Sequence, residues 1–351
     1  MSDSVRFLRL GRLPWRTTQA FYHAVADCMK EGTPDTLIFA VPDEPYFCIG
    51  YHQNPSDFLD VTYCRRRGLG ILRRRLGGGA VFLDSDQFFF QCVFHRSRVP
   101  ARVDALFRML LTPPVAALKG MGFDAELEGI NEITVGGRRI SGTGAGWIGE
   151  ASVVVGNVLV DFPFEEMVRA WNLPSKIFRR LASEGLQAHL TTLRRESETP
   201  PSMDAIEEHF FNAYTKALSR PLVEGALTHE ELKTAGRLET ELTDPHWLEE
   251  HPVHVGRKRL KIARGVYICE TMFQTESAEA VLTARINRGI IEALEIHRPG
   301  QEVVNGNRNC AIAGARSRHP KDMARAVVRF SELKYVEEAL EVLAHETLRE
   351  E

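Results

Sequence analysis

The residues of this sequence best suited to hold an anion lie in one stretch, Arg73 to Asp84. Three arginines at positions 73–75 stand just before Gly77, Gly78 and Gly79. Consecutive glycines let the backbone approach a ligand closely, and their successive N–H groups can form an anion-binding concavity. Neighbouring arginines neutralise phosphate or carboxylate charge. The stretch predicts a strand, an anion-binding turn and a second strand, although a glycine-rich hairpin with solvated arginines would have the same residues.

A second stretch with chemical potential runs from Asn131 to Gly144. The alternation over 132–135 followed by a Gly-Gly pair is typical of a β-hairpin. Arg138 and Arg139 then point to opposite faces of the returning strand, so we expect one of them to face the sheet or a cleft. The small residues over 141–146 leave space for a ligand beside that arginine.

A polar segment, Gly50 to Asn54, directly follows the apolar run Tyr46 to Ile49. Side chains that contact ligands often stand where a buried strand gives way to a loop. His52 is therefore a candidate ligand contact, with an ordinary surface histidine as the alternative.

Composition indicates an ordinary soluble globular protein, with 44% hydrophobic and 26% charged residues. The length of 351 residues favours one large domain plus a smaller one. A net charge of −3 gives no electrostatic reason to expect nucleic acid or an anionic membrane as the main partner. No signal peptide is visible, and no apolar run approaches the ~20 residues of a membrane span. We therefore expect a cytoplasmic protein.

The cysteines argue against a metal or redox centre. The chain has six, and none forms a CxxC pair, so neither a zinc site nor a redox dithiol is indicated. Most, such as Cys48 and Cys92, stand in apolar context, which is typical of buried thiols in a reducing compartment. No metal-ligating residues are predicted.

The elements that must position these stretches are predicted from periodicity. Helices are expected over residues 17–30, 57–68, 103–121, 176–184 and 204–219. Strands are expected over residues 36–41, 46–49, 80–94 and 151–160. After Pro221 the pattern changes to a charged helix, a Pro245–Trp247 turn with an aromatic anchor, several strands, and helices over 321–330 and 333–345. This predicts an α+β protein with domains of residues 1–225 and 226–351.

Four stretches in this order resemble the lipoate–protein ligase family, within the wider biotin and lipoate ligase fold. They are Ile49 to Asn54, Arg73 to Asp84, Asn131 to Ile133, and Arg138 to Thr143. The turn at Pro245, followed by a small domain, resembles the accessory domain of the larger ligases. The resemblance covers roughly residues 5 to 220 and, more loosely, the C-terminal part. It implies a mixed-sheet catalytic domain and a small C-terminal α+β accessory domain.

The resemblance also implies a chemistry. Such ligases use ATP and Mg²⁺ to activate lipoate as lipoyl-adenylate, and pass the acyl group to one lysine of a lipoyl carrier protein or domain. Both the lipoate carboxylate and the ATP phosphates are anionic, so a glycine turn and an arginine can hold them. A monomer is expected. The implied catalytic residue is Arg139, and the implied cofactor-binding residues are Arg74, Gly77, Gly78, Gly79, Ala80, His52, Asn131, Ser141 and Gly142.

The sequence departs from the family pattern at several positions. The family has a small polar residue in place of Leu76, a histidine in place of Leu83, and glycine-asparagine in place of Asp86-Gln87. Its central lysine aligns with Arg139. Arginine keeps the charge and can hold an anion bidentately, but it is bulkier and planar, so the exchange is not conservative.

Two other functions compete with a ligase. Carrier-to-carrier octanoyl or lipoyl transfer needs a nucleophilic cysteine or a direct aminolysis site. No cysteine lies near Asn131 or between Gly185 and Leu193, which argues against a transferase. The third possibility is a catalytically degenerate binder of lipoylated proteins, suggested by Arg139 and Leu83.

Overall fold

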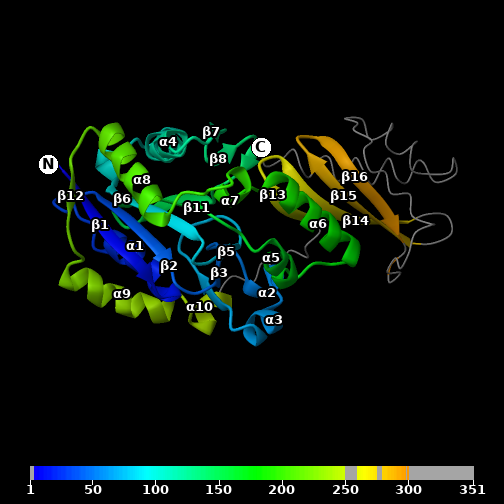
Figure 1. The fold of residues 1–351 in the computed structure, drawn as a ribbon. Coiled ribbons are helices and arrows are strands. Elements are labelled where there is room, and N and C mark those ends of the chain that lie inside the picture. The colour runs from blue at the N-terminus through cyan, green and yellow to red at the C-terminus, as the bar shows by residue number, and fades with distance from the viewer. Residues whose placement is uncertain (1–3, 250–258, 275–278, 298, 300–351) are drawn as a thin grey trace. The chain divides into compact units, whose positions relative to one another are not determined.

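The computed structural model describes residues 4–249, 259–274, 279–297 and 299, and Figure 1 shows their arrangement. The helices predicted beyond residue 320 lie outside the described residues. The protein has an α+β fold built on a mixed sheet, as the sequence predicts.

Contacts divide the chain into two compact units. Unit 1 comprises residues 1–163 and 191–254, and unit 2 comprises residues 164–190 and 255–351. This division does not coincide with the predicted boundary near residue 225. The predicted boundary divides the chain at one point, whereas residues 164–190 from the middle of the chain pack with C-terminal strands.

The core of unit 1 is a six-stranded mixed sheet. β1 pairs in parallel with both β2 and β12, and the remaining neighbours are antiparallel. β2 and β6 are buried along their whole length, which explains why both read as apolar runs rather than alternating strands. In spatial order the strands are β10 (Thr143–Ile148), β11 (Ala151–Leu159), β6 (Gln87–His95), β2 (Thr36–Pro42), β1 (Val5–Leu13) and β12 (Leu222–Glu224).

Helices cover both faces of this sheet (Figure 1). On one face, α4 (Val103–Gly120) and α8 (Met203–Leu218) bury an aromatic core with the strands, and on the other lies α1 (Trp15–Asp27). α9 (His229–Glu241) packs on α1 and begins with a complete capping box. Pro113 and Pro114 stand inside α4, which continues through them.

Two three-stranded sheets carry the stretches with chemical potential. The first contains β4 (Gly70–Arg73), β3 (Tyr46–Ile49) and β5 (Val81–Leu83) in that order, and the second contains β7 (Ala125–Glu128), β8 (Glu132–Val135) and β9 (Arg138–Arg139). Short helices complete unit 1: α2 (Pro55–Phe58), α3 (Val61–Arg66), η1 (Arg96–Arg98), α7 (Leu193–Glu196) and α10 (Pro245–Glu249). The helix predicted over 57–68 is thus two short helices. The break follows Phe58, and Asp60 caps the second helix by accepting from the N–H of Tyr63.

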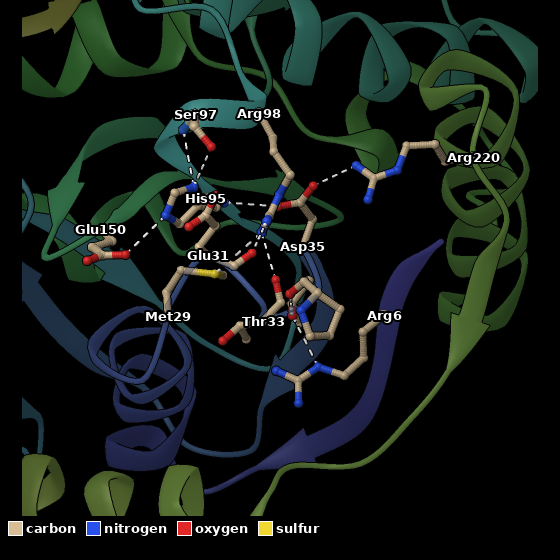
Figure 2. Close-up of polar contacts among 12 residues, drawn as sticks. Arg6, Met29, Glu31, Thr33, Asp35, His95, Ser97, Arg98, Glu150 and Arg220 are labelled. Atoms are coloured by element: carbon tan, nitrogen blue, oxygen red, sulfur yellow. Dashed lines mark hydrogen bonds and ion pairs between the residues drawn. The ribbon is translucent and has the colours of Figure 1, made fainter. Parts of the chain in front are cut away.

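A buried carboxylate joins chain segments next to strands β2, β6 and β12 of the large sheet (Figure 2). Asp35 has no exposed surface and pairs with the guanidinium groups of Arg98 and Arg220, at 2.8 and 2.6 Å. It also accepts from the backbone N–H of His95 at the end of β6. Arg220 in turn donates to the carbonyl of Ser4, just before β1. Two cations and a backbone donor offset the desolvation of this carboxylate, so we interpret the cluster as structural.

The described residues of unit 2 form a four-stranded antiparallel sheet and two helices. Its strands are β13 (Arg259–Ala263), β14 (Val266–Gln274), β15 (Glu279–Asn287) and β16 (Ile290–His297), and its helices are α5 (Phe164–Ala170) and α6 (Lys176–His189). α6 passes through Gly185, the predicted end of a shorter helix. A Cβ on Gly185 would stand 3.3 to 3.7 Å from Arg285, Ile268 and Ile262. Its small size brings the helix close to the strands, so tertiary packing overrides the usual meaning of a glycine near a helix end.

Candidate active site

The glycine turn joins β4 to β5 and is exposed. Gly77, Gly78 and Gly79 all lie at the surface, and Ala80 is half-buried. Gly78 has a φ of +100°, which side chains rarely adopt. A Cβ on Gly50 would stand only 2.0 Å from the carbonyl oxygen of Gly78. The segment carrying His52 and the glycine turn therefore meet by direct backbone approach, which the sequence predicted for the turn but not for Gly50.

Arg74 braces the turn from inside. It is 7% exposed, and its guanidinium donates to the carbonyl oxygens of Gly77 (2.7 Å), Gly79 (3.0 Å) and Cys48 (3.2 Å). A Cβ on Gly78 would stand 2.7 Å from the same guanidinium. The carbonyl groups of Gly77 and Gly79 thus point toward Arg74. These contacts brace the turn, whereas the predicted contact of Arg74 with the ligand stays a prediction.

The other two arginines of the run also have protein partners. Arg73 is fully buried, donates to the carbonyl of Tyr51, and lies 4.2 Å from the centroid of the Trp247 ring. Arg75 pairs with Asp27 of α1 and Glu241 of α9. The hypothesis of solvated arginines therefore does not describe this turn, because all three guanidinium groups have protein partners.

Arg138 and Arg139 have separate partners. Arg138 pairs with Glu196 at 2.6 Å, and Glu196 also accepts from the hydroxyl of Thr191. Arg139 donates to the carbonyl of Ser141 at 3.0 Å and lies 3.6 Å from the carboxylate of Glu132. The side chain of Arg139 keeps 29% of its surface exposed. A half-buried guanidinium with one longer ion pair can take an additional anion without losing its present support.

The loop after Arg139 is fixed by a chain of amides that the sequence reading missed. The N–H of Gly142 donates to Asn157 Oδ1 at 2.6 Å, and Asn157 Nδ2 donates to Gln87 Oε1 at 2.5 Å. Gln87 donates in turn to the carboxylate of Asp84. Burial raises the pKa of Asp84 to about 6. The end of the glycine stretch is thereby linked to the Arg139 loop, and the polar residue inside the apolar run of β11 was the available signal.

The remaining predicted residues are placed as follows. His52 is exposed, with its ring edge against Tyr51 at 4.9 Å. Asn131 is exposed, and its carbonyl accepts from the hydroxyl of Thr143. Ser141 is fully buried, and its Oγ has no hydrogen-bond partner among the residues the structure describes. Their roles toward a ligand stay predictions.

A comparison with protein-family models decides the family. Residues 14–215 match the model described as the lipoyl protein ligase A/B catalytic domain. The chain belongs to this family. The match covers more than half of the sequence and includes both the glycine turn and Arg139, so the predicted relationship to lipoate–protein ligases is confirmed.

Relatives within the lipoyl ligase A/B family carry two kinds of name. The chain is 26% identical over 268 residues to the octanoyltransferase LipM of Kyrpidia tusciae, covering 69% of this chain and 97% of that protein. It is 33% identical over 124 residues to the lipoate–protein ligase LplJ of Bacillus subtilis, covering 33% of this chain and 34% of that protein. The family therefore contains enzymes of both activities.

Solved structures of lipoate ligases share the fold. The bipartite lipoate protein ligase of Thermoplasma acidophilum, described with its E2 lipoyl domain, matches with a TM-score of 0.65 and 21% identity, covering 71% of this chain and 97% of that chain. A lipoate–protein ligase A bound with ATP matches with a TM-score of 0.60 and 20% identity, covering 71% and 99%. These likenesses confirm the predicted ligase-like fold.

The cysteine thiols of this family member are poor nucleophiles where the structure describes them. Cys48, Cys64, Cys92 and Cys269 are buried, and Cys28 is half-buried. Burial raises the pKa of Cys48, and it raises that of Cys92 to about 12. The thiolate is the reactive form, so burial disfavours the reactive form of Cys48 and Cys92. Cys310 lies outside the described residues.

The described part of the chain has neither a metal-binding cluster nor a membrane-spanning helix. No three or more His, Cys, Asp or Glu side chains there are grouped so that they could hold a metal ion. None of the helices within the described ranges is both long and apolar enough to cross a membrane.

Two further residues with unusual surroundings were missed by sequence reasoning about the site. His23 of α1 is fully buried and accepts from the N–H of Arg75 at 3.0 Å, and burial lowers its pKa to about 3. Trp247 of α10 donates from its indole N–H to the carbonyl of Arg73 at 2.9 Å. The sequence marked Trp247 only as an aromatic anchor, because its partner lies 174 residues away.

Proposed function

We propose that this protein is an ATP-dependent lipoate–protein ligase. It activates lipoate as lipoyl-adenylate, with release of pyrophosphate, and transfers the lipoyl group to a lysine of a lipoyl carrier domain. Family membership supports lipoyl chemistry. The carrier is supported by the archaeal relative, which is described together with its E2 lipoyl domain.

The burial of the cysteines that the structure describes supports a ligase over a transferase. A cysteine-dependent transferase needs an accessible thiol of low pKa. Cys48 adjoins the glycine turn, but it is 1% exposed and burial raises its pKa. Acyl transfer through an adenylate needs no such thiol, because the adenylate is already an activated acyl group that the lysine amine can attack.

The residues of the two predicted stretches suit an anionic junction. The backbone N–H groups of the exposed Gly77 to Gly79 and of the half-buried Ala80 would face the acyl carboxylate or phosphate, and Arg139 would balance its charge. Mg²⁺ usually keeps several waters and binds through substrate phosphates with only one or two carboxylates, so a dedicated metal cage is not required. Its contribution would be to share the phosphate charge.

The proposal also covers the oligomeric state, the cellular location and the partners of the protein. We propose a monomer that acts in the cytoplasm on a protein acceptor, with neither nucleic acid nor membrane as partner. The net charge of −3 supports this, since it provides no general attraction to anionic polymers or surfaces.

One assay tests the proposal. The purified full-length chain is incubated with ATP, Mg²⁺ and lipoate, and pyrophosphate release is followed together with the mass of an added lipoyl carrier domain. We expect pyrophosphate release that depends on lipoate, and a carrier heavier by one lipoyl group. Absence of both products with an active control ligase would reject the proposal.

The second candidate is an octanoyltransferase. It is favoured by the LipM relatives, of which the chain covers 97% in one case and 95% in another. Its test omits ATP and supplies an octanoylated carrier protein together with the lipoyl carrier domain. Octanoylation of the acceptor without ATP would favour this reading. Binding of a lipoylated carrier without either reaction would favour the degenerate binder, for which Arg139 and the buried Leu83 are the motivation.

A further inference from the structure

The residues from His229 to Glu249, here called the α9–α10 strap, pack against the glycine-turn half of unit 1. Arg6 of β1 forms an ion pair with the 2% exposed Glu231 of α9. Thr17 of α1 donates to Glu239 at 2.6 Å. The strap therefore has fixed anchors that are independent of the turn.

The end of the strap covers the open edge of β4. β4 is the outer strand of its sheet, so the outward backbone groups of its last residue, Arg73, lack a strand partner. The N–H of Arg73 donates to the carbonyl of Leu242 at 3.0 Å, and its carbonyl accepts from the indole N–H of Trp247 at 2.9 Å. The strap thus supplies both hydrogen bonds that a neighbouring strand would make.

The same indole also holds the side chain of Arg73. The guanidinium carbon lies 4.2 Å from the Trp247 ring centroid, and the ring of Tyr51 lies 5.8 Å from that of Trp247. A desolvated cation above an indole face is a favourable pair. Trp247 therefore restrains Arg73 through its backbone carbonyl and through its side chain.

The glycine turn depends on the position of Arg73. The next residue, Arg74, carries the guanidinium that braces the carbonyls of Gly77 and Gly79. Arg75 follows and is tied to the strap by Glu241. A shift of Arg73 would therefore move the brace and the turn together.

We propose that Trp247 is a positioning residue for the glycine turn, acting through Arg73 and Arg74 to preorganise the backbone that receives the acyl carboxylate. The proposal rests on the proposed function for the identity of the ligand. Preorganisation lowers the ordering cost of binding, so the role should appear in the affinity for lipoate more than in the rate of chemistry.

The test compares three variants of the full-length chain. Trp247→Phe keeps a ring beside Arg73 but removes the indole donor, and Trp247→Ala removes both. His246→Ala, an exposed neighbour on α10, is the matched control. Hydrogen exchange is measured for the protected amides of Arg74 and Arg75, and steady-state kinetics give KM for lipoate and kcat.

We expect exchange at these two amides to be about fivefold faster in Trp247→Phe and faster still in Trp247→Ala, from the loss of one hydrogen bond. KM for lipoate should rise by a similar factor, while kcat stays within about twofold. His246→Ala should match the wild type. Unchanged exchange and KM in Trp247→Ala, or a fall in kcat alone, would overturn the proposal.

Failure of the two proposals can be told apart. A wild-type chain that makes no lipoyl-adenylate rejects the ligase function, and the exchange comparison then decides the role of Trp247 by itself. Melting curves of all three variants identify any general loss of structure, and Trp247→Phe provides the comparison if Trp247→Ala does not fold.

Discussion

Arg139 occupies the position that we expect to align with the central lysine of lipoate–protein ligases, and its surroundings fit an arginine. Its Nε donates to the carbonyl of Ser141, and Glu132 lies 3.6 Å away. A lysine has a single ammonium and could not donate to that carbonyl while presenting a separate planar edge to a ligand. An arginine at this position thus keeps the charge of a lysine and adds a hydrogen bond that supports the loop.

Single substitutions distinguish the role of Arg139 from that of its neighbour Arg138. We expect Arg139→Ala to lower the rate of lipoyl-adenylate formation by about a hundredfold, as for loss of a charge-stabilising donor. Arg139→Lys should retain activity, because it keeps the positive charge and introduces the lysine that we expect at this position in the family. Pyrophosphate release under single-turnover conditions is the measurement.

Arg138→Ala is the matched control. It removes the partly exposed pair with Glu196, so the unfolding free energy should fall by about 1 kcal/mol or less, while the rate stays within about twofold of the wild type. Equal rates for Arg139→Ala and the wild type would place Arg139 outside the chemistry and strengthen the degenerate-binder reading.

At Gly78, both the limited space and the backbone conformation disfavour a side chain. We expect Gly78→Val to abolish lipoate binding, because its Cβ would meet the Arg74 guanidinium at 2.7 Å and the φ of +100° disfavours a β-branched residue. Calorimetry with lipoate measures the loss, and circular dichroism checks the fold. Normal binding by a folded Gly78→Val would show that the turn is only structural.

At the scale of elements, α9 shows how a locally well-specified helix acquires its function from its neighbours. Its capping box at Thr228 and Glu231 and its charged pattern specify a helix before any packing. Its assignment to unit 1 depends on contacts with β1 and α1, which are about 220 residues distant in sequence. Local sequence signals therefore specify that this segment is helical, whereas long-range contacts determine where the helix packs.

A glycine inside α9 allows a test of this element. Gly236 is exposed, lies in mid-helix, and has open space around its Cβ position. Gly236→Ala should raise the unfolding free energy by about 0.5–1 kcal/mol. Thr228→Ala, which removes the cap, should lower it by about 1 kcal/mol. Denaturant titration gives both values, and a destabilising Gly236→Ala would mean that α9 is not helical there.

At the scale of the whole molecule, the buried His23 makes stability depend on pH. Its folded pKa of about 3 lies below the ordinary value of 6.5, so the folded state disfavours the protonated ring. Its contribution is therefore complete above pH 6.5 and is lost progressively as the pH falls toward 3. The loss approaches about 1.4 kcal/mol per pH unit within that window.

The variant His23→Gln tests this dependence. The difference in unfolding free energy between wild type and variant should shrink as the pH is lowered from 6.5 to 5, because only the wild type gains a proton on unfolding. His229→Gln, at an exposed position on α9, is the control and should keep the wild-type profile. Parallel profiles of unfolding free energy against pH for wild type and His23→Gln would contradict the lowered pKa of His23.

The sequence by itself determined the family, the α+β class and the two stretches that carry the proposed site. Those features are local: glycines that permit a positive φ, alternation that makes a hairpin, and apolar runs that make buried strands. What each arginine contacts was decided only by the tertiary structure. Arg73, Arg74 and Arg75 are adjacent, yet they contact α10, the turn carbonyls, and α1 with α9. Such partners come from segments far apart in the chain, and no local pattern of residues specifies which of them will meet.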